Sequence, residues 1–465
     1  MDKVTIGFVP AHRDPFDEAW AIDMRRRTLE ALSQVDGLEV IVPDENWTQN
    51  GLVRDDSDAD AVIDLFSNAG VSGVIIGTMT FGDEISAVSV AEALSVPVLL
   101  FGTKEGDFTA DGNRRSDSFC GTLSISSGLY RRKIPFVFAG NFFPEEEGFV
   151  GSVDDFVRTC AIAQSFYGAR IGQVGPRPER FETCAINELP MIEHFGQRVV
   201  PISLADVFAA ANGLADDDVM VATILEDMCG VADCSGVDRE ALVKSAKLEQ
   251  ALLSWADEKN LSGMGLQCWT AMQEVYGISS CTTMGRLTSR GIMTSCEVDI
   301  HGALTMLVQH QASLGTALPH FIDWTIQHQE LDDVFFAWHC GNAPQDLACP
   351  GCTPRLRSHS ILNRRVGDEI SQGTAEFQLQ PGVVTLNRLV EYDGVFKMLI
   401  TTGEIIPSEQ ELRGSWSWVQ VEDLDFLYRV LVEEGFIHHA SMIHGDFTLP
   451  IVDFCDFAGI EAVIV

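Results

Sequence analysis

Residues 4–9 of the chain read Val-Thr-Ile-Gly-Phe-Val, a short apolar run of the length expected for a buried β-strand. Similar runs recur at residues 73–76 and 96–101, and amphipathic stretches with helical spacing lie between them at residues 17–32 and 57–68. Such an alternation is typical of a parallel sheet that is covered by helices on both faces. The first third of the sequence therefore predicts a doubly wound α/β domain at residues 1–147.

The alternation of strands and helices starts again after this domain and later gives way to a strand-rich pattern. Strand-like runs near the C-terminus occupy residues 377–380, 383–390 and 395–401. The Tyr392-Asp393-Gly394 segment between the last two runs has the composition of a hairpin turn. We therefore expect an α/β fold class, with a second doubly wound parallel-sheet domain at residues 148–310 and a β-rich domain at residues 311–465.

The chain is strongly acidic, because its 465 residues include 68 acidic and 31 basic side chains, for a formal net charge of -37. Such a surface repels phosphate backbones and anionic lipid headgroups, so we expect no nucleic-acid partner and no membrane partner. The apolar runs are far shorter than the roughly 20 residues that span a bilayer, and the N-terminus lacks a signal-peptide pattern. We therefore expect a cytoplasmic protein whose 12 Cys are reduced and mostly buried.

Four segments in the second half of the chain combine acids or imidazoles with apolar neighbours. They contain Glu297 with Asp299, then Asp323, then His339, and finally His438 with His439. A carboxylate among apolar residues is costly to bury unless it is paired or binds a metal. Two of the segments also have an ordinary explanation, since Glu297 and Asp299 suit the first turn of a helix and a lone His such as His339 suits a hydrogen-bonded core position. Together, the segments have the composition of a metal site with oxygen and nitrogen ligands.

His438 and His439 are adjacent in a segment that is expected to be extended. Neighbouring side chains of an extended chain point to opposite faces. The pattern therefore predicts that only one of these two imidazoles faces a given site, and it leaves open which one.

These segments resemble the metal-site segments of the L-fucose isomerase and L-arabinose isomerase superfamily. The matching stretches read CEVDIHGALTM, FIDWT, WHCGNAP and GFIHHASMIHGD, while GTAEFQLQPGVVTLNRL and FKMLITTGE resemble the superfamily's C-terminal β-rich domain. The resemblance implies aldose–ketose isomerisation of a free monosaccharide with a divalent metal, commonly Mn²⁺. It also implies a homo-oligomer, a trimer or a hexamer, with active sites at subunit interfaces.

The resemblance also implies roles for individual residues. Glu297 and Asp323 match the two carboxylate ligands, and they are the candidate catalytic groups. His339 matches a ligand of the arabinose branch. His439 matches the C-terminal His ligand of that branch, and His438 stays an alternative because the fucose branch has a single His in this stretch.

The expected reaction explains why these residue types are needed. Isomerisation moves a proton between two carbons through an enediol, and a cation polarises the carbonyl and offsets the developing negative charge. Carboxylate and imidazole ligands suit Mn²⁺ and other divalent ions of similar hardness, whereas a thiolate site would select zinc. Glu297 and Asp323 would exchange the proton, with the assignment of base and acid left open.

Candidate substrate contacts come from two further places in the sequence. His12 and Arg13 follow the first predicted strand, at the edge where ligands of parallel sheets bind; for Arg13 the alternative is a solvated position. Trp324 and Trp338 are candidate apolar faces for a sugar ring, and their alternative is core packing.

Three other features have a weaker interpretation. Cys349 and Cys352 have zinc-like spacing, but a second pair is missing, so an ordinary loop is the simpler explanation. Arg388 and Lys397 lie in predicted strands and have no assigned role.

Two alternative functions stay open. A non-catalytic sugar-binding or regulatory protein would have paired α/β lobes, and its acids and imidazoles would be scattered or paired with Arg. An epimerase or a retro-aldol enzyme would use the same metal site, because it shares the enediolate intermediate.

Overall fold

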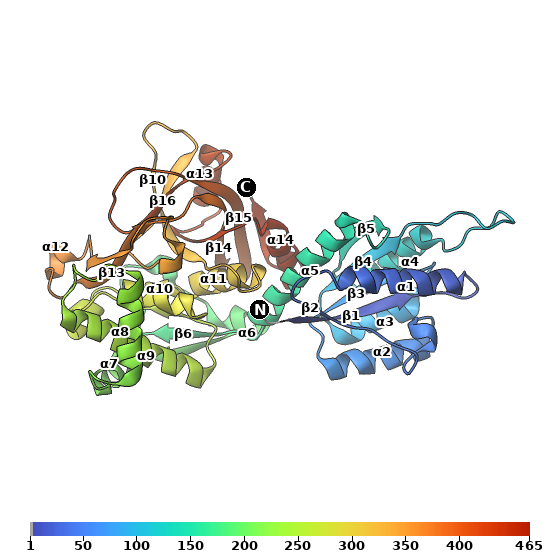
Figure 1. Ribbon diagram of the computed structural model, residues 1–465, viewed down its shortest axis with the longest axis horizontal. Coiled ribbons are helices and arrows are strands. Elements are labelled where there is room, and N and C mark those ends of the chain that lie inside the picture. Colours follow the sequence, from blue (N-terminus) through green and yellow to red (C-terminus); the bar gives the residue numbers. More distant parts are fainter. Residues whose placement is uncertain (1–2) are drawn as a thin grey trace. The chain divides into compact units, whose positions relative to one another are not determined.

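The computed structural model describes residues 3–465, and it contains three β-sheets (Figure 1). The chain forms two compact units, of which one comprises the residues up to Gln164 with Val452–Ala458. The other comprises Ser165–Ile451 with Gly459–Val465. Among the described residues, none of the helices has the length and apolar character that a bilayer-spanning helix requires.

The first unit is built around a parallel sheet of five strands in the order β2-β1-β3-β4-β5. Its strands are β1 (Val4–Ala11), β2 (Leu38–Ile41), β3 (Gly73–Thr78), β4 (Val98–Thr103) and β5 (Val137–Phe142). Its helices are α1 (Glu18–Leu32), α2 (Asp56–Ala69), α3 (Glu84–Leu94) and α4 (Ser118–Arg131), and α5 (Glu147–Phe166) begins in it. The strand order reverses between β1 and β3, which is the edge where such sheets bind ligands.

A second parallel sheet has four strands in the order β7-β6-β8-β9. These strands are β6 (Arg170–Val174), β7 (Arg198–Ile202), β8 (Gly263–Leu266) and β9 (Met293–Cys296). The connecting helices are α6 (Glu188–Phe195), α7 (Leu204–Gly213), α8 (Val219–Val231), α9 (Arg239–Lys259), α10 (Cys281–Ser289) and α11 (Ile300–Ala312).

The third sheet has nine strands in the order β12-β13-β16-β11-β10-β17-β14-β15-β18 and is mainly antiparallel. Its strands are β10 (His320–Gln327), β11 (Val334–His339), β12 (Arg355–Ser358), β13 (Gln372–Gln378), β14 (Gly382–Tyr392), β15 (Val395–Ile406), β16 (Ser415–Gln420), β17 (His439–His444) and β18 (Glu461–Ile464). The helices of this part are α12 (Asn363–Val366), α13 (Leu424–Glu433) and α14 (Thr448–Ala458).

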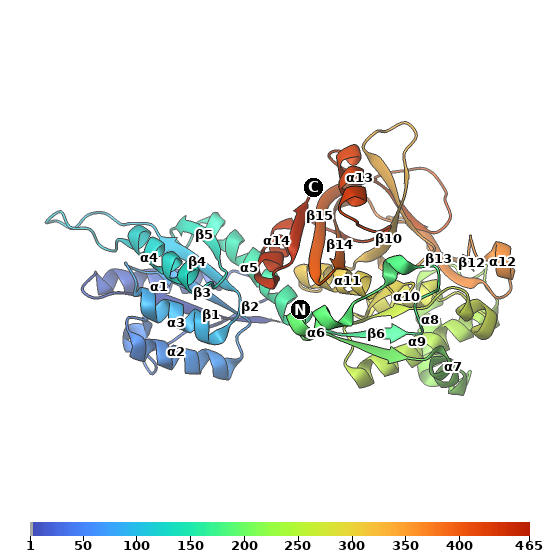
Figure 2. The ribbon, with the colours of Figure 1, turned by 180° about the vertical axis from the view of Figure 1, so that it is seen from behind.

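Helix α11 lies between the four-stranded and the nine-stranded sheet, as both ribbon views show (Figures 1 and 2). It contacts β8 and β9 on one side and β14 and β17 on the other, and nearly all of its residues are buried. A helix that is buried around nearly its whole circumference requires such an enclosed position, and its buried polar groups require hydrogen-bond partners. Gln309 fixes its register, because its amide donates to the Thr385 and Ser441 carbonyls and its own oxygen accepts the Ser441 hydroxyl. The last turns of α11 are therefore held against β14 and β17 of the nine-stranded sheet.

The observed sheets confirm the predicted fold class, with two parallel α/β sheets and a large mixed sheet toward the C-terminus. The predicted hairpin is also present, since Tyr392 pairs with Val395 across a turn in which Asp393 and Gly394 both have positive φ. The division into three domains with boundaries at 147 and 310 stays a prediction.

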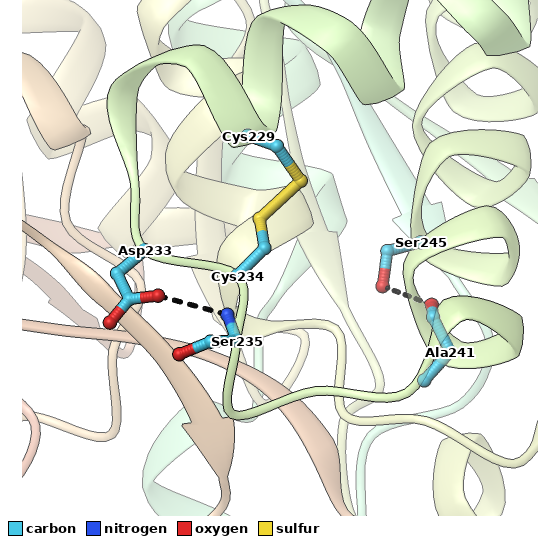
Figure 3. The surroundings of a disulfide bond; sticks show 6 residues. All are labelled: Cys229, Asp233, Cys234, Ser235, Ala241 and Ser245. Carbon is cyan, nitrogen blue, oxygen red and sulfur yellow. Dashed lines mark hydrogen bonds between the residues drawn. A yellow bond between two sulfur atoms is a disulfide. The ribbon is translucent and has the colours of Figure 1, made fainter.

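The expectation that all cysteines are reduced is wrong for four of them. Cys229 in the last turn of α8 pairs with Cys234, which follows the helix (Figure 3), and Cys349 pairs with Cys352. Their Cα atoms are 5.7 Å and 5.2 Å apart, within the range that a disulfide needs, because a turn brings each pair together. Cys349 and Cys352 thus lie in a loop, as the simpler interpretation holds, and their thiols are not free to bind zinc.

Candidate active site

Glu297 lies in a backbone turn that connects β9 to α11. Glu297 and Val298 have φ values of 57° and 59°, a conformation that is uncommon for residues other than glycine and rare for β-branched ones. The turn packs against Gly265 of β8, where a Cβ atom would lie 2.8 Å from the backbone of Val298. Backbone strain of this kind concentrates at functional sites, where the surrounding structure holds it in place.

Asp323 and His439 are brought together by strand register. Asp323 of β10 pairs directly with His439 of β17, and directly opposed residues of antiparallel strands share one face of the sheet. The Nε2 atom of His439 lies 3.6 Å from Asp323 Oδ1 and 3.5 Å from Glu297 Oε2. Two carboxylates that are 26 residues apart in the sequence thus converge on one imidazole nitrogen.

His438 also approaches Glu297, with its Nε2 atom 3.9 Å from Glu297 Oε2. The rings of His438 and His439 have centroids only 4.0 Å apart. The expectation that only one of the two faces the site is therefore wrong, because His438 precedes β17 and is not bound by strand alternation. The two differ in burial, since the His438 side chain is 40% exposed and that of His439 is 1% exposed.

His339 ends β11 next to the same group of side chains. One ligand atom from each of Asp323, His339 and His439 lies within 4.8 Å of the other two. The ring of Phe321 packs against both imidazoles, with centroid distances of 5.7 Å to His339 and 4.7 Å to His439. The Nδ1 atom of His339 accepts the backbone N–H of Cys340 at 2.9 Å, which places the proton of the neutral ring on Nε2.

A buried ion pair adjoins this group. Asp299 accepts two hydrogen bonds from the guanidinium of Arg388 in β14, at 2.5 Å and 3.0 Å. It accepts a third from Nδ1 of His439 at 2.8 Å, and it caps α11 by accepting the backbone N–H of Gly302 at 2.9 Å. Each carboxylate oxygen of Asp299 therefore has two donors.

Burial and charge shift the protonation of these groups in different directions. Burial raises the pKa of Asp323 to about 6, although His439 and His438 oppose that shift. Burial alone would also raise the pKa of Asp299, but Arg388 and His439 lower it well below its usual range. Burial lowers the pKa of His339 well below its usual value. The pKa of His438 is raised overall, because Glu297 and Asp323 outweigh the effect of its burial.

Two carboxylate oxygens at this site have no hydrogen-bond donor among the described residues. They are Oε2 of Glu297 and Oδ1 of Asp323, the same two atoms that lie near Nε2 of His439. A buried carboxylate oxygen without a donor is costly unless a cation compensates it. Carboxylate oxygens with an imidazole nitrogen form a donor set that suits a divalent cation such as Mn²⁺. The residues present therefore fit a metal.

Comparisons with known proteins show the family of this chain. The model of the fucose/sulfoquinovose isomerase N-terminal domain matches residues 7–167, and that of the L-fucose isomerase C-terminal domain matches residues 337–465. The chain belongs to the fucose isomerase family. His12 and Arg13 fall in the N-terminal family domain and His339, Arg388 and His439 in the C-terminal one, whereas Glu297 and Asp323 lie between the two matches.

Among relatives of this fucose isomerase family member are two sulfoquinovose isomerases. That of Alkalicoccus urumqiensis is 26% identical, over 96% of this chain and 96% of the relative. That of Priestia aryabhattai is 25% identical, over 99% of each protein. A solved galactofuranose binding protein covers 67% of this chain and 90% of its own, at 13% identity and a TM-score of 0.18, which is too low to support an inference.

The candidate substrate contacts of the N-terminal part have partners in their own unit. His12 is buried directly after β1, at the predicted sheet edge, with its Nδ1 atom 2.8 Å from the Thr80 hydroxyl. The guanidinium of Arg13 donates to Asp83 and Glu84 at 3.1 Å and 3.0 Å. Their contact with substrate stays a prediction.

The two tryptophans proposed as sugar-ring contacts are placed differently. Trp324 packs on Phe335 with a centroid distance of 4.7 Å, and it lines a cavity of about 290 Å³ together with hydrophobic residues of α13. It follows Asp323 in the strand, so it points to the other face of the sheet. The ring of Trp338 lies beside His339 at 6.3 Å, and its Nε1 atom donates to the Arg413 carbonyl at 2.7 Å.

Sequence reasoning left three neighbours of the site without a role. Arg388 is one of them, although a charged residue inside an apolar strand was itself a signal, because a buried charge requires a partner. Cys184, whose Sγ atom lies 3.8 Å from Nδ1 of His439, had no recognisable pattern. Phe181 is the third, with its ring 6.5 Å from that of His438 and 5.9 Å from that of Trp269.

Proposed function

We propose that this protein is a divalent-metal-dependent aldose–ketose isomerase that acts on a free monosaccharide through an enediol. The observation that carries the proposal is the approach of Glu297 and Asp323 to the same nitrogen of His439. The buried guanidinium of Arg388 is bound by Asp299 and leaves both carboxylates free for a cation. Membership in the fucose isomerase family supports the same activity.

The metal ligands in this proposal are Glu297, Asp323 and His439. When bound, the cation polarises the substrate carbonyl and offsets the negative charge that develops on oxygen. His339 and His438 are further candidate metal ligands, and each has a feature that makes it a weaker candidate than His439. The Nε2 atom of His339 carries a proton as long as Nδ1 accepts from Cys340, whereas His438 is exposed and shares the Glu297 carboxylate. We expect Mn²⁺ to be an effective ion, because oxygen and imidazole donors suit it.

The two carboxylates supply the proton transfer. Burial raises the pKa of Asp323 to about 6 in the metal-free protein, and a bound cation would favour the ionised form, in which the carboxylate can accept a proton. Glu297 is the partner carboxylate, held in place by the strained turn before α11. One of the two takes the proton from carbon and the other exchanges a proton with substrate oxygen. Phe321 keeps water from one side of the imidazoles.

The relatives point to the first substrate to try. They are named sulfoquinovose isomerases, so we propose a sugar of this kind, with L-fucose and L-arabinose as alternatives from the wider superfamily. The rings of Phe181, Trp269 and His438 form a candidate aromatic wall for the sugar. We further expect a homo-oligomer that works in the cytoplasm.

A panel of aldoses tests this function. Metal-stripped protein is incubated with each sugar in D₂O, with and without added Mn²⁺. We expect ketose formation only with metal, and deuterium at the exchanged carbon. Product identity separates isomerisation from epimerisation or retro-aldol cleavage. A protein that binds Mn²⁺ and converts no sugar in the panel would contradict the proposal.

The alternative of a non-catalytic sugar receptor is less well supported. It predicts acids that are scattered or paired with arginine, whereas Glu297 and Asp323 converge without an arginine partner among the described ion pairs. We therefore make no separate proposal for it.

A further inference from the structure

We propose that Asp299 and Arg388 are positioning residues, which hold the ring of His439 so that its Nε2 atom faces Glu297 and Asp323. The inference rests on the function proposed above, because it takes His439 to be a metal ligand. It assigns a role to two residues that do not themselves belong to the proposed ligand set.

The contact with Asp299 holds the His439 ring in a single orientation. Its Nδ1 atom donates to Oδ2 of Asp299 at 2.8 Å, and the side chains of both residues are 1% exposed. An imidazole that carries its proton on Nδ1 has a free electron pair on Nε2, which is the form that binds a metal. Among the described residues, the only other hydrogen-bond partner of Nδ1 is the Sγ atom of Cys184, at 3.8 Å. Asp299 therefore selects both the ring orientation and the tautomer.

Arg388 is needed because Asp299 is a buried carboxylate, which is costly without a partner of opposite charge. Its planar guanidinium binds both oxygens of Asp299, at 2.5 Å and 3.0 Å, a geometry that a lysine does not reproduce. Arg388 comes from β14 and Asp299 from the start of α11, so the pair connects the nine-stranded sheet to this helix. Arg388 neutralises the charge of Asp299, and the negative charges of Glu297 and Asp323 stay available for a cation.

The same arrangement keeps Asp299 out of the proposed ligand set. Its two oxygens accept four hydrogen bonds, from Arg388, His439 and the backbone of Gly302. In contrast, Glu297 Oε2 and Asp323 Oδ1 have no donor among the described residues. A carboxylate with all lone pairs occupied is a poor metal ligand, so the cation is left to the other two.

Binding of Mn²⁺ to the metal-free protein tests this inference. The free ion is measured by its electron paramagnetic resonance signal, and folding is followed by circular dichroism. The main variant is the double substitution D299A/R388M, which removes the pair without leaving a buried charge. The matched control is E249A/R286M, which removes a similarly buried ion pair elsewhere, with Nε of Arg286 at 2.6 Å from Glu249. The remaining partners of that pair, Arg290 and Asp227, are largely exposed. The conservative variant is R388K, which keeps the charge and loses the two-pronged geometry.

We expect D299A/R388M to bind Mn²⁺ roughly 10- to 100-fold more weakly than the unmodified protein, as is usual when the partner of a ligating histidine is lost. The control E249A/R286M is expected to bind with unchanged affinity, and R388K to fall between the two. Affinity of D299A/R388M within twofold of the unmodified protein would overturn the inference. If D299A/R388M fails to fold, R388K decides, and unchanged affinity in R388K would overturn it.

A second measurement separates this inference from the proposed function. If the unmodified protein binds no Mn²⁺, the proposed function fails. The positioning role is then still tested by the crystal structure of metal-free D299A/R388M. We expect its His439 ring to be rotated away from Glu297 and Asp323, and a ring in the original orientation would overturn the inference.

Discussion

Asp323 and His439 are paired directly across β10 and β17, and this register places Oδ1 of the acid 3.6 Å from Nε2 of the imidazole. The Asp323 oxygen has no hydrogen-bond donor among the described residues, and burial raises the pKa of this acid to about 6. A one-residue slip of either strand would turn one of the two side chains to the other face of the sheet. The site is therefore a consequence of strand register.

The substitution Asp323→Asn tests the role of this acid in proton transfer. It keeps the size of the side chain and removes the base, so we expect turnover at saturating Mn²⁺ to fall by roughly 10²- to 10⁴-fold. Turnover is measured with the best sugar from the panel. The exposed Asp332→Asn, near the start of β11, is the control and is expected to retain full activity. Full activity of Asp323→Asn would exclude the acid from the chemistry.

The adjacent histidines are expected to differ in their effect on metal affinity. His439→Gln removes a buried imidazole that two carboxylates approach, and we expect Mn²⁺ affinity to fall at least about tenfold. His438→Gln removes an exposed ring that approaches Glu297 only at 3.9 Å, and we expect a change of less than about threefold. Isothermal titration of metal-free protein measures both. The opposite ranking would show that His438 is the ligand.

Gly265→Ala is expected to disturb the turn that carries Glu297. The added Cβ would lie 2.8 Å from backbone atoms of Val298, so either the turn or β8 must shift. We expect a loss of about 1–3 kcal/mol in the free energy of unfolding, together with weaker Mn²⁺ binding. The control is Gly151→Ala in α5, where nothing lies within 4 Å of the added atom. That change is expected to stabilise the protein by about 0.5–1 kcal/mol. If urea unfolding gave the same free energy of unfolding for Gly265→Ala and the unmodified protein, the close packing at Gly265 would be contradicted.

Asp453 in α14 is expected to make stability depend on pH. Burial, followed by the nearby charges of Asp155 and Asp456, raises its pKa in the folded protein to about 6. The unfolded chain has a pKa of about 3.9, so the folded state binds the proton more tightly. The stabilisation that comes from protonating Asp453 in the folded protein is therefore complete below about pH 4, and it is lost as the pH rises through about 6.

Asp453→Asn removes this dependence. We expect the variant to be more stable than the unmodified protein by about 1–2 kcal/mol at pH 8, and to have no such advantage at pH 4. Chemical unfolding at the two pH values measures the difference. If the variant and the unmodified protein differed in free energy of unfolding by the same amount at pH 4 and at pH 8, the raised pKa of Asp453 would be contradicted.

Much of the fold was predictable, because hydrophobic periodicity is a local property of the chain. The run at residues 4–9 lies within β1, and the expected turn at Asp393 and Gly394 joins β14 to β15. The disulfide between Cys229 and Cys234 was not predictable, since five-residue spacing closes only when the turn after α8 brings the two Cα atoms within 5.7 Å.

The amino-acid sequence alone determined the α/β class, the acidic surface and the segments that carry the candidate ligands, because each depends on composition or on spacing within a short stretch. Tertiary structure decided how these side chains meet. The Asp299–Arg388 pair joins residues 89 positions apart, and the backbone of Val298, which has a positive φ, lies where a side chain at Gly265 would be. Such relationships arise only when distant segments are packed against each other, since burial turns an ordinary cap and an unassigned arginine into an obligatory pair.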